Sequence, residues 1–157
     1  YNSIMFHGVK VSSTEIRRLL LEGEVQLAAK LLKRRFGNTG VVERGDRLGH
    51  TIGFPTANLA IDSELLVPRI GVYAVKVELP GGERWPGMMN IGTRPTVNGK
   101  DHRKEVHLIG FDGELEGEEL RVEYVKRLRD EQKFDGVEAL KAQLSHDRQA
   151  ALKVLKG

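Results

Sequence analysis

The sequence contains no cysteine, few aromatic residues and no long hydrophobic run. The absence of cysteine among 157 residues excludes disulfides, thiol catalysis and zinc-thiolate sites, and it fits a reducing cytoplasm, where we expect the protein to act. Its apolar runs are only a few residues long, whereas roughly 18 are needed to span a bilayer, so we expect no membrane partner. Aromatic residues make up only 6% of the chain, so few side chains are available to stack on the bases of a nucleic acid.

The composition that remains is that of a globular domain with a mild positive charge. Hydrophobic residues account for 39% and charged residues for 30%, and the net charge is +3. Such a charge fits either an enzyme that binds a polyphosphate or a nucleic-acid binder. The histidines show no i, i+4 pair and no loop follows the EF-hand pattern, so we expect any metal ion to arrive with a ligand.

Helical periodicity is confined to the two ends of the chain. Residues 12–35 begin with Ser12 as a possible N-cap and Glu15 three positions later, and Gly23 interrupts the apolar stripe. The final stretch opens with Asp135 and Glu138 as a possible capping box and continues with apolar residues at helical spacing. The sequence therefore predicts a short helical N-terminal segment and one C-terminal helix.

Between these helices the pattern changes to short strands separated by turns. "TGVVER" is one candidate strand, and "GVYAVKVELPGGERWPGMMNIG" predicts a hairpin around Pro80-Gly81-Gly82 with a return strand reaching Ile91. "EVHLIGF" and "ELRVEYVKRLR" predict two more strands, and apolar and charged residues alternate in the second. We therefore expect a small β-barrel, with a boundary to the helical segment near residues 35–37.

The stretch "GDRLGHTIGFPTAN" is the first candidate site. Its glycines would let backbone N–H groups approach phosphate oxygens. Thr56 and Asn58 would share one face of an extended segment and offer hard oxygens suited to Mg²⁺. A glycine-rich turn followed by an edge strand, with both side chains satisfying local backbone groups, explains the same spacing. The chain contains no Walker A motif.

Two further stretches could carry chemistry. Glu105 stands at the head of "EVHLIGF", where a barrel rim could bury it partly and make it a useful general base, although many glutamates at strand ends are simply solvated. In "RLRDEQKFDG", arginines beside a phenylalanine could cover a flat aromatic ligand or a phosphate, or form an ordinary charged loop.

Several motifs, in this order, closely resemble the riboflavin kinase module of bacterial bifunctional FAD synthetase: "GFPTANL", "GVYAV", "NIGTRPT" and "EVHLIGFDGELEGEELRVEYVKRLRDEQKFD". The resemblance covers about residues 37–155. It implies a mainly β fold, a six-stranded antiparallel Greek-key β-barrel with a C-terminal helix. It also implies transfer of the γ-phosphoryl group of MgATP to the ribityl 5'-hydroxyl of riboflavin, giving FMN and ADP.

The same resemblance assigns roles to individual residues. Thr56 and Asn58 are expected to bind Mg²⁺ and the ATP phosphates, and Glu105 to deprotonate the 5'-hydroxyl. The nucleotide is expected to be covered by the stretch 45–53, with Gly45, Gly49, His50 and Gly53, and the flavin to be held by Arg129 and Phe134. His50 stands where this family usually has Arg or Lys, and a largely neutral imidazole would hold a phosphate less firmly.

Residues 1–35 resemble the end of the adenylyltransferase module of that enzyme, and residues 36–157 its kinase domain. The S-S-T-x-x-R motif, which contacts nucleotide phosphates in the intact protein, is matched by Ser12, Ser13, Thr14 and Arg17. The H-x-G-H motif of that module is missing, and "FHGVK" around His7 does not replace it. The opening "YNSIMFHGVK" has no initiator Met and no signal-peptide pattern, so we expect a piece of a longer chain that does not make FAD by itself.

Two other functions must be weighed against a kinase. A basic barrel that binds RNA or single-stranded DNA would interleave aromatic residues with Lys and Arg on strand faces, yet Tyr73 falls on an apolar face, so we expect no nucleic-acid partner. A structural or docking domain would show no turnover. Incubation with riboflavin and MgATP distinguishes these functions, because only a kinase forms FMN.

Overall fold

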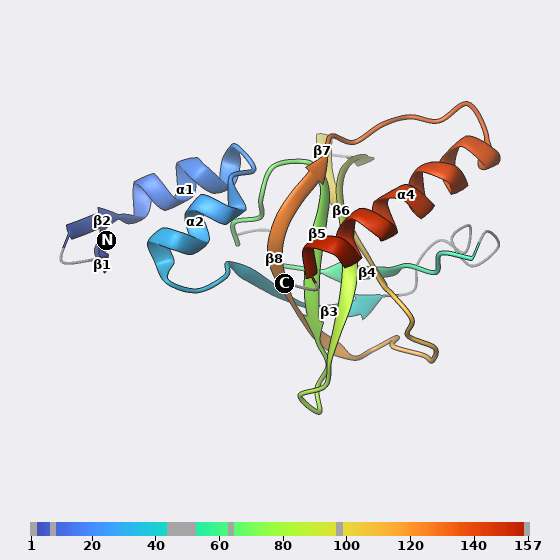
Figure 1. Cartoon of the computed structure of the whole chain (residues 1–157), viewed down its shortest axis with the longest axis horizontal. Coiled ribbons are helices and arrows are strands. Elements are labelled where there is room, and N and C mark those ends of the chain that lie inside the picture. The colour runs from blue at the N-terminus through green and yellow to red at the C-terminus, as the bar shows by residue number, and fades with distance from the viewer. Residues whose placement is uncertain (1–2, 7–8, 44–52, 63–64, 97–98, 156–157) are drawn as a thin grey trace.

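We describe the protein from a computed structural model, which covers residues 3–6, 9–43, 53–62, 65–96 and 99–155. A pair of short helices lies at one side of a barrel, and a longer helix runs along another side (Figure 1). The helices are α1 (Ser13–Leu21), α2 (Val25–Leu32) and α4 (Val137–Leu155). The strands are β1 (Ser3–Phe6), β2 (Val9–Ser12), β3 (Gly37–Glu43), β4 (Ala57–Ala60), β5 (Gly71–Glu78), β6 (Arg84–Thr96), β7 (Gly99–Leu108) and β8 (Glu119–Arg129).

Six strands close into an antiparallel barrel in the order β3-β4-β7-β6-β5-β8. Strands β5, β6 and β7 follow one another as hairpins, and β8 returns to lie beside β5, which is the Greek-key arrangement. This confirms the predicted six-stranded Greek-key barrel with its C-terminal helix. Closure leaves no free edge along the barrel wall.

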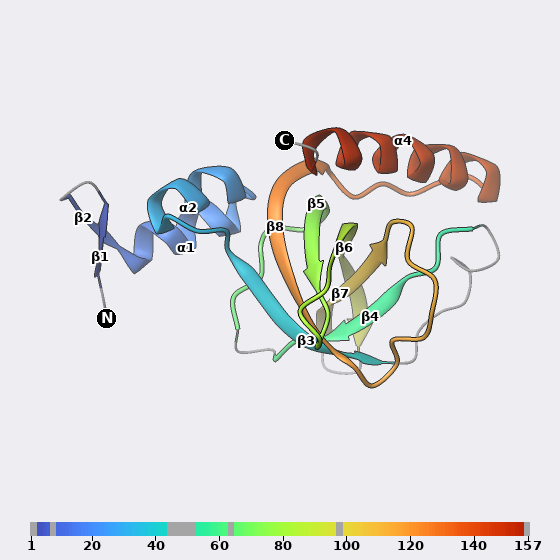
Figure 2. The ribbon, with the colours of Figure 1, turned by 60° about the horizontal axis from the view of Figure 1, so that its bottom comes forward.

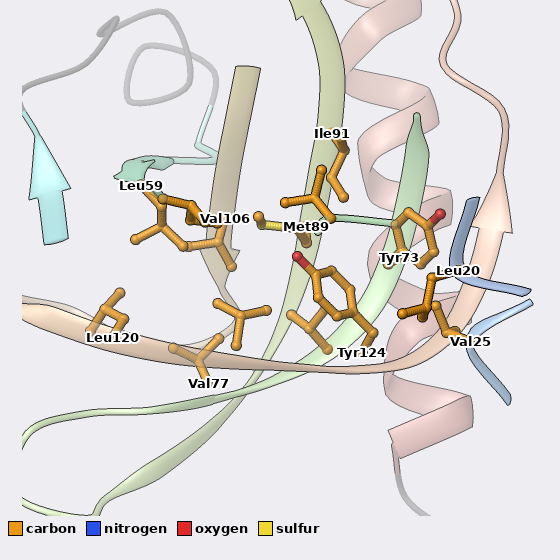
Figure 3. Packing of buried hydrophobic residues seen from close by; sticks show 14 of the residues in the cluster. Leu20, Val25, Leu59, Tyr73, Val77, Met89, Ile91, Val106, Leu120 and Tyr124 are labelled. Atoms are coloured by element: carbon orange, nitrogen blue, oxygen red, sulfur yellow. The ribbon is translucent and has the colours of Figure 1, made fainter. Parts of the chain in front are cut away.

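The barrel interior is a packed apolar core. Tyr73, Val75 and Val77 of β5 belong to it with 0% exposure, as the alternation of the sequence predicted. Figure 3 shows Tyr73 and Val77 within this cluster. Tyr124 of β8 meets the ring of Tyr73 edge to face, with centroids 5.4 Å apart. Side chains fill this interior, so a ligand must bind elsewhere.

A second apolar layer lies outside the barrel wall, beneath α4. Ala74 of β5 and Met88 of β6 face outward and pack with Phe54 and with Ala151 of the helix. Figure 2 shows α4 lying across the barrel, with the chain between β8 and α4 running beneath it. Because α4 covers β5 from outside, this strand is buried on both faces, which a single-faced alternation did not predict.

The N-terminal helices share the core of the barrel. Leu20 of α1 and Val25 of α2 are almost fully buried and belong to the same apolar cluster as Tyr73. The predicted break at Gly23 is confirmed, since this residue has φ of +83° between the two helices. The short hairpin β1–β2 before them was not predicted.

Two strands extend beyond their predicted limits. Strand β7 begins at Gly99, so Glu105 lies within the strand and the prediction that it heads the strand is wrong. Strand β6 continues to Thr96, past Ile91. Both extensions form one hairpin of polar residues, whose pairing comes from backbone hydrogen bonds and leaves no alternation of apolar residues to detect.

Among the residues that the structure covers, no helix combines the length and the apolar character required to cross a membrane.

Candidate active site

A cavity of about 230 Å³ lies between the outer wall of the barrel and α4. The chain that follows β8 completes its lining. Apolar side chains from the barrel and the helix form one part of the lining: Phe54, Val72, Met88, Leu140 and Leu144. Polar side chains form another part: Thr56, Asn90, Arg103, Glu105 and His107. The site therefore offers an apolar surface for a flat ring beside a set of hydrogen-bonding groups.

Three polar residues form a row across adjacent strands of this wall. In the strand register, Glu105 of β7 is paired with Asn58 of β4 on one side and with Asn90 of β6 on the other. The Oδ1 atoms of both asparagines are buried without a hydrogen-bond partner. Buried amide oxygens are nearly always paired in folded proteins, so these two oxygens are acceptors that a ligand could use.

Glu105 is held on the outer wall of β7 rather than at the barrel rim, which corrects the prediction. Its side chain is 15% exposed, and the Nε of Arg103 lies 3.6 Å from its Oε1. The same guanidinium reaches Glu131, with Nη2 3.9 Å from Oε2. Gly92 makes room for this second carboxylate, because a Cβ there would collide with Oε2 of Glu131. Arg103 thus links the row to the chain that follows β8.

Thr56 lines the cavity just before β4, and Asn58 stands two positions later in that strand. Gly53 precedes them with φ of +87° and open space around its Cα, so its backbone is accessible. The remaining members of the predicted nucleotide loop, Gly45, Gly49 and His50, lie outside the described residues. In the part of the chain that the structure covers, no three His, Cys, Asp or Glu side chains gather to form a metal site.

Arg129 and Phe134 both line the cavity, with the guanidinium 5.8 Å from the ring centroid. The guanidinium is already engaged by the protein. Its Nε donates to Asp147 at 2.9 and 3.0 Å, its Nη2 donates to the same carboxylate at 2.7 Å, and its Nη1 donates to the carbonyl oxygen of Asp130. Arg129 therefore presents an oriented, partly satisfied guanidinium rather than a freely moving one.

Asp147 was missed from the sequence, although a signal was present. Its side chain is 2% exposed inside α4 and also accepts a hydrogen bond from Gln143. Asp147 stands in the apolar stripe of the helix, three residues after Leu144 and four before Ala151. A carboxylate within such a stripe indicates a buried cationic partner, because an unpaired buried charge is costly.

His107 was also missed as a site residue. It is 7% exposed and lies on the same face of β7 as Glu105, with its ring 5.4 Å from that of Phe54. Its Nδ1 lies 2.8 Å from the carbonyl oxygen of Pro55, and its Nε2 is buried without a partner. Burial lowers the pKa of His107, and the nearby Arg148 guanidinium lowers it further against the opposing effect of the Pro55 hydrogen bond. The alternation of β7 could have identified this residue.

None of the S-S-T-x-x-R residues is among those that line this cavity. Ser12 ends β2, and Ser13, Thr14 and Arg17 fall in the first turns of α1 with exposed side chains where these are described. The nucleotide contact that the resemblance implies for them stays a prediction.

Comparison with known protein families decides the class of the domain. The family model described as riboflavin kinase (flavokinase) matches residues 32–155. The chain belongs to the riboflavin kinase family. It is 42% identical over 147 residues to the bifunctional riboflavin kinase/FMN adenylyltransferase of Bacillus subtilis, and 44% identical over 144 residues to that of Escherichia coli. Each alignment covers 92% of this chain but only 46% of the relative, so the chain spans about half the length of these curated relatives.

Solved structures share the fold of this riboflavin kinase domain. A crystal structure from Streptococcus pneumoniae, described as a macrolide-efflux protein, aligns with a TM-score of 0.87 and 36% identity over 95% of this chain and 49% of that one. The riboflavin kinase of Trypanosoma brucei aligns with a TM-score of 0.52 and 21% identity over 76% of each chain. At that level of identity the second likeness shows a common fold alone.

Proposed function

We propose that this chain transfers the γ-phosphoryl group of MgATP to the ribityl 5'-hydroxyl of riboflavin, giving FMN and ADP. The observation that carries the proposal is the strand-paired row of Asn58, Glu105 and Asn90 on the outer wall of the barrel, in a domain of the riboflavin kinase family. Glu105 and Asn90 of this row line the cavity. The apolar part of the cavity suits an isoalloxazine ring. Given these substrates, we expect the protein to act in the cytoplasm and to need no nucleic-acid partner.

In this proposal Glu105 is the general base. It accepts the 5'-hydroxyl proton while the oxygen forms a bond to the γ-phosphorus and the bond to ADP breaks. Support comes from its place on the cavity wall and from Arg103, whose guanidinium lies 3.6 Å from the carboxylate on one side. Arg129 and Phe134 are proposed to hold the flavin at the other end of the cavity.

Thr56 and Asn58 are the proposed ligands of the Mg²⁺ that accompanies ATP. The unpaired, buried Oδ1 of Asn58 fits this role, because Mg²⁺ prefers hard oxygen ligands. Such an ion is often bound by protein oxygens and substrate phosphate oxygens together. When bound, Mg²⁺ neutralises negative charge on the phosphoryl oxygens. The stretch with Gly45, Gly49, His50 and Gly53 is proposed to cover the nucleotide.

The division of the chain and the wider activity are also proposals. We infer that residues 1–35 end an adenylyltransferase module and that residues 36–157 form the kinase domain, since the relatives in B. subtilis and E. coli are bifunctional. Chromatography of the products with riboflavin, FMN, ATP and Mg²⁺ tests both activities: we expect FMN from riboflavin, and no FAD from FMN.

Replacing Glu105 with Gln tests the proposed base. The substitution keeps the shape of the side chain and removes the proton acceptor, so we expect turnover to fall by roughly 10²-fold or more with riboflavin affinity largely retained. Initial rates of FMN formation and flavin fluorescence titration measure the two quantities. Glu114→Gln, in the loop between β7 and β8 with an exposed side chain, is the matched control and should leave both unchanged. Undiminished turnover in Glu105→Gln would remove Glu105 from the mechanism.

A further inference from the structure

His107 has two ring nitrogens with different surroundings. Its Nδ1 faces the carbonyl oxygen of Pro55 at 2.8 Å, and a carbonyl oxygen can only accept a hydrogen bond. The proton of the neutral ring therefore lies on Nδ1, and Nε2 carries a lone pair. That Nε2 is buried and has no donor within reach in the part of the chain that the structure covers.

A buried acceptor without a donor is costly unless a ligand supplies one. His107 is more than nine-tenths buried and lines the cavity, in contact with Phe54 of the same wall. A buried acceptor that has lost its hydrogen bond to water keeps the full cost of desolvation, and a binding partner that donates to it removes that cost. The geometry points to an N–H or O–H donor of the substrate opposite Nε2.

The spacing along β7 selects which substrate donor this is. His107 stands two residues from Glu105 on the same face, and two residues of a strand span about 6.5 Å. If Glu105 receives the 5'-hydroxyl proton, a group at that distance meets the ribityl chain, whose secondary hydroxyls follow the 5'-hydroxyl. The ring N3–H lies at the far end of the isoalloxazine and is out of reach.

We propose that His107 is a positioning and specificity residue: its Nε2 accepts a hydrogen bond from a secondary hydroxyl of the ribityl chain, and its Nδ1–H holds Pro55 and the adjoining Thr56 in place. This inference rests on the proposed riboflavin kinase function. His107 would then join the ribityl chain of the substrate to the protein segment that carries the proposed Mg²⁺ ligands. A flavin without the ribityl chain then binds without help from His107.

Two substitutions separate the two nitrogens. The side-chain amide of Asn can still donate to Pro55 but has no group at the position of Nε2, whereas the oxygen of Gln can occupy that position but Gln has no donor near Pro55. We expect His107→Asn to weaken riboflavin binding about tenfold, which corresponds to about 1.4 kcal/mol, and to leave MgATP binding unchanged. We expect His107→Gln to bind riboflavin within about twofold of the parent and to bind MgATP more weakly.

Equilibrium titration of flavin fluorescence with riboflavin, 3-methylriboflavin and lumiflavin tests the proposal. The loss of affinity caused by His107→Asn should be equal for riboflavin and 3-methylriboflavin. It should be absent for lumiflavin, which lacks the ribityl chain. Urea unfolding checks that the variants stay folded, and His146→Asn, exposed on α4, is the matched control.

The outcomes separate this inference from the proposed function. Parent-like riboflavin binding by His107→Asn, or an equal loss for lumiflavin, overturns the role of Nε2 alone. Riboflavin binding without FMN formation contradicts the proposed reaction and leaves the His107 contact supported. A parent protein that does not bind riboflavin contradicts both.

Discussion

The ion pair of Arg129 and Asp147 joins the end of β8 to the buried side of α4. Both oxygens of the carboxylate are used, since Arg129 contacts each of them and Gln143 donates to Oδ1. The pair therefore orients Arg129 at the cavity and anchors the helix that forms one wall of it. Its contribution can be measured separately from any activity.

We expect Asp147→Asn to lower the free energy of unfolding by about 3 kcal/mol, because removal of one partner leaves a largely buried guanidinium without its counter-charge. Urea unfolding measures the loss. The double variant Arg129→Gln/Asp147→Asn should recover part of it, since no lone charge is left. A loss below about 0.5 kcal/mol in Asp147→Asn would show that water replaces the pair without cost.

At the same scale, some site residues could be predicted and others could not. Thr56, Glu105, Arg129 and Phe134 were all predicted, and all four line one cavity, while their chemical roles stay predictions. The alternation of β7 places His107 on the same face as Glu105, but its hydrogen-bond partner, the Pro55 carbonyl, lies 52 residues away in the chain and could not be predicted. A single sequence shows residue types and local spacing, but it does not show which distant backbone groups will be left over to pair with them.

At the scale of elements, the alternation of β8 and the periodicity of α4 predicted both correctly. The ends of β6 and β7 could not be predicted, because their polar hairpin is held by backbone pairing that no side-chain pattern records. Where strands approach closely, a single position can also lack space for any side chain, and the composition of the sequence does not show this. Gly87 of β6 is such a position, facing the interior beside Val75 and Val77.

We expect Gly87→Ala to destabilise the barrel by about 2 kcal/mol, because the added Cβ would lie 2.8 Å from the carbonyl oxygen of His107 and the backbone must shift. Thermal or urea unfolding measures the effect. Gly81→Ala, in the open turn of the same hairpin, should change the free energy of unfolding by less than about 0.5 kcal/mol. Equal effects at both positions would contradict the close approach.

At the scale of the whole molecule, the N-terminal helices and the barrel should unfold together. The predicted boundary near residues 35–37 separates two sequence patterns, yet Leu20 and Val25 complete the apolar cluster that contains Tyr73 (Figure 3). Periodicity cannot reveal this, since it shows that a helix has an apolar face and not what the face packs against. The two segments therefore depend on one core.

We expect Leu20→Ala to lower the free energy of unfolding by about 2–5 kcal/mol and to shift a single transition, as reported both by Trp85 fluorescence in β6 and by helical circular dichroism. Leu21→Ala, at a position 52% exposed, is the control and should have little effect. A loss of helical signal before the Trp85 signal changes would show that the N-terminal helices form a separate unit.

The placement of the cavity on the outer wall makes the site depend on strand register. Along β7, Glu105 and His107 face the cavity, while Val106 and Leu108 alternate with them and point into the barrel core. A shift of β7 by one residue against its neighbours would put the carboxylate inside the barrel and an isopropyl group in the cavity. Single-residue insertions or deletions in β7 should therefore be far less tolerated than substitutions, because they remove the core and the site in the same event.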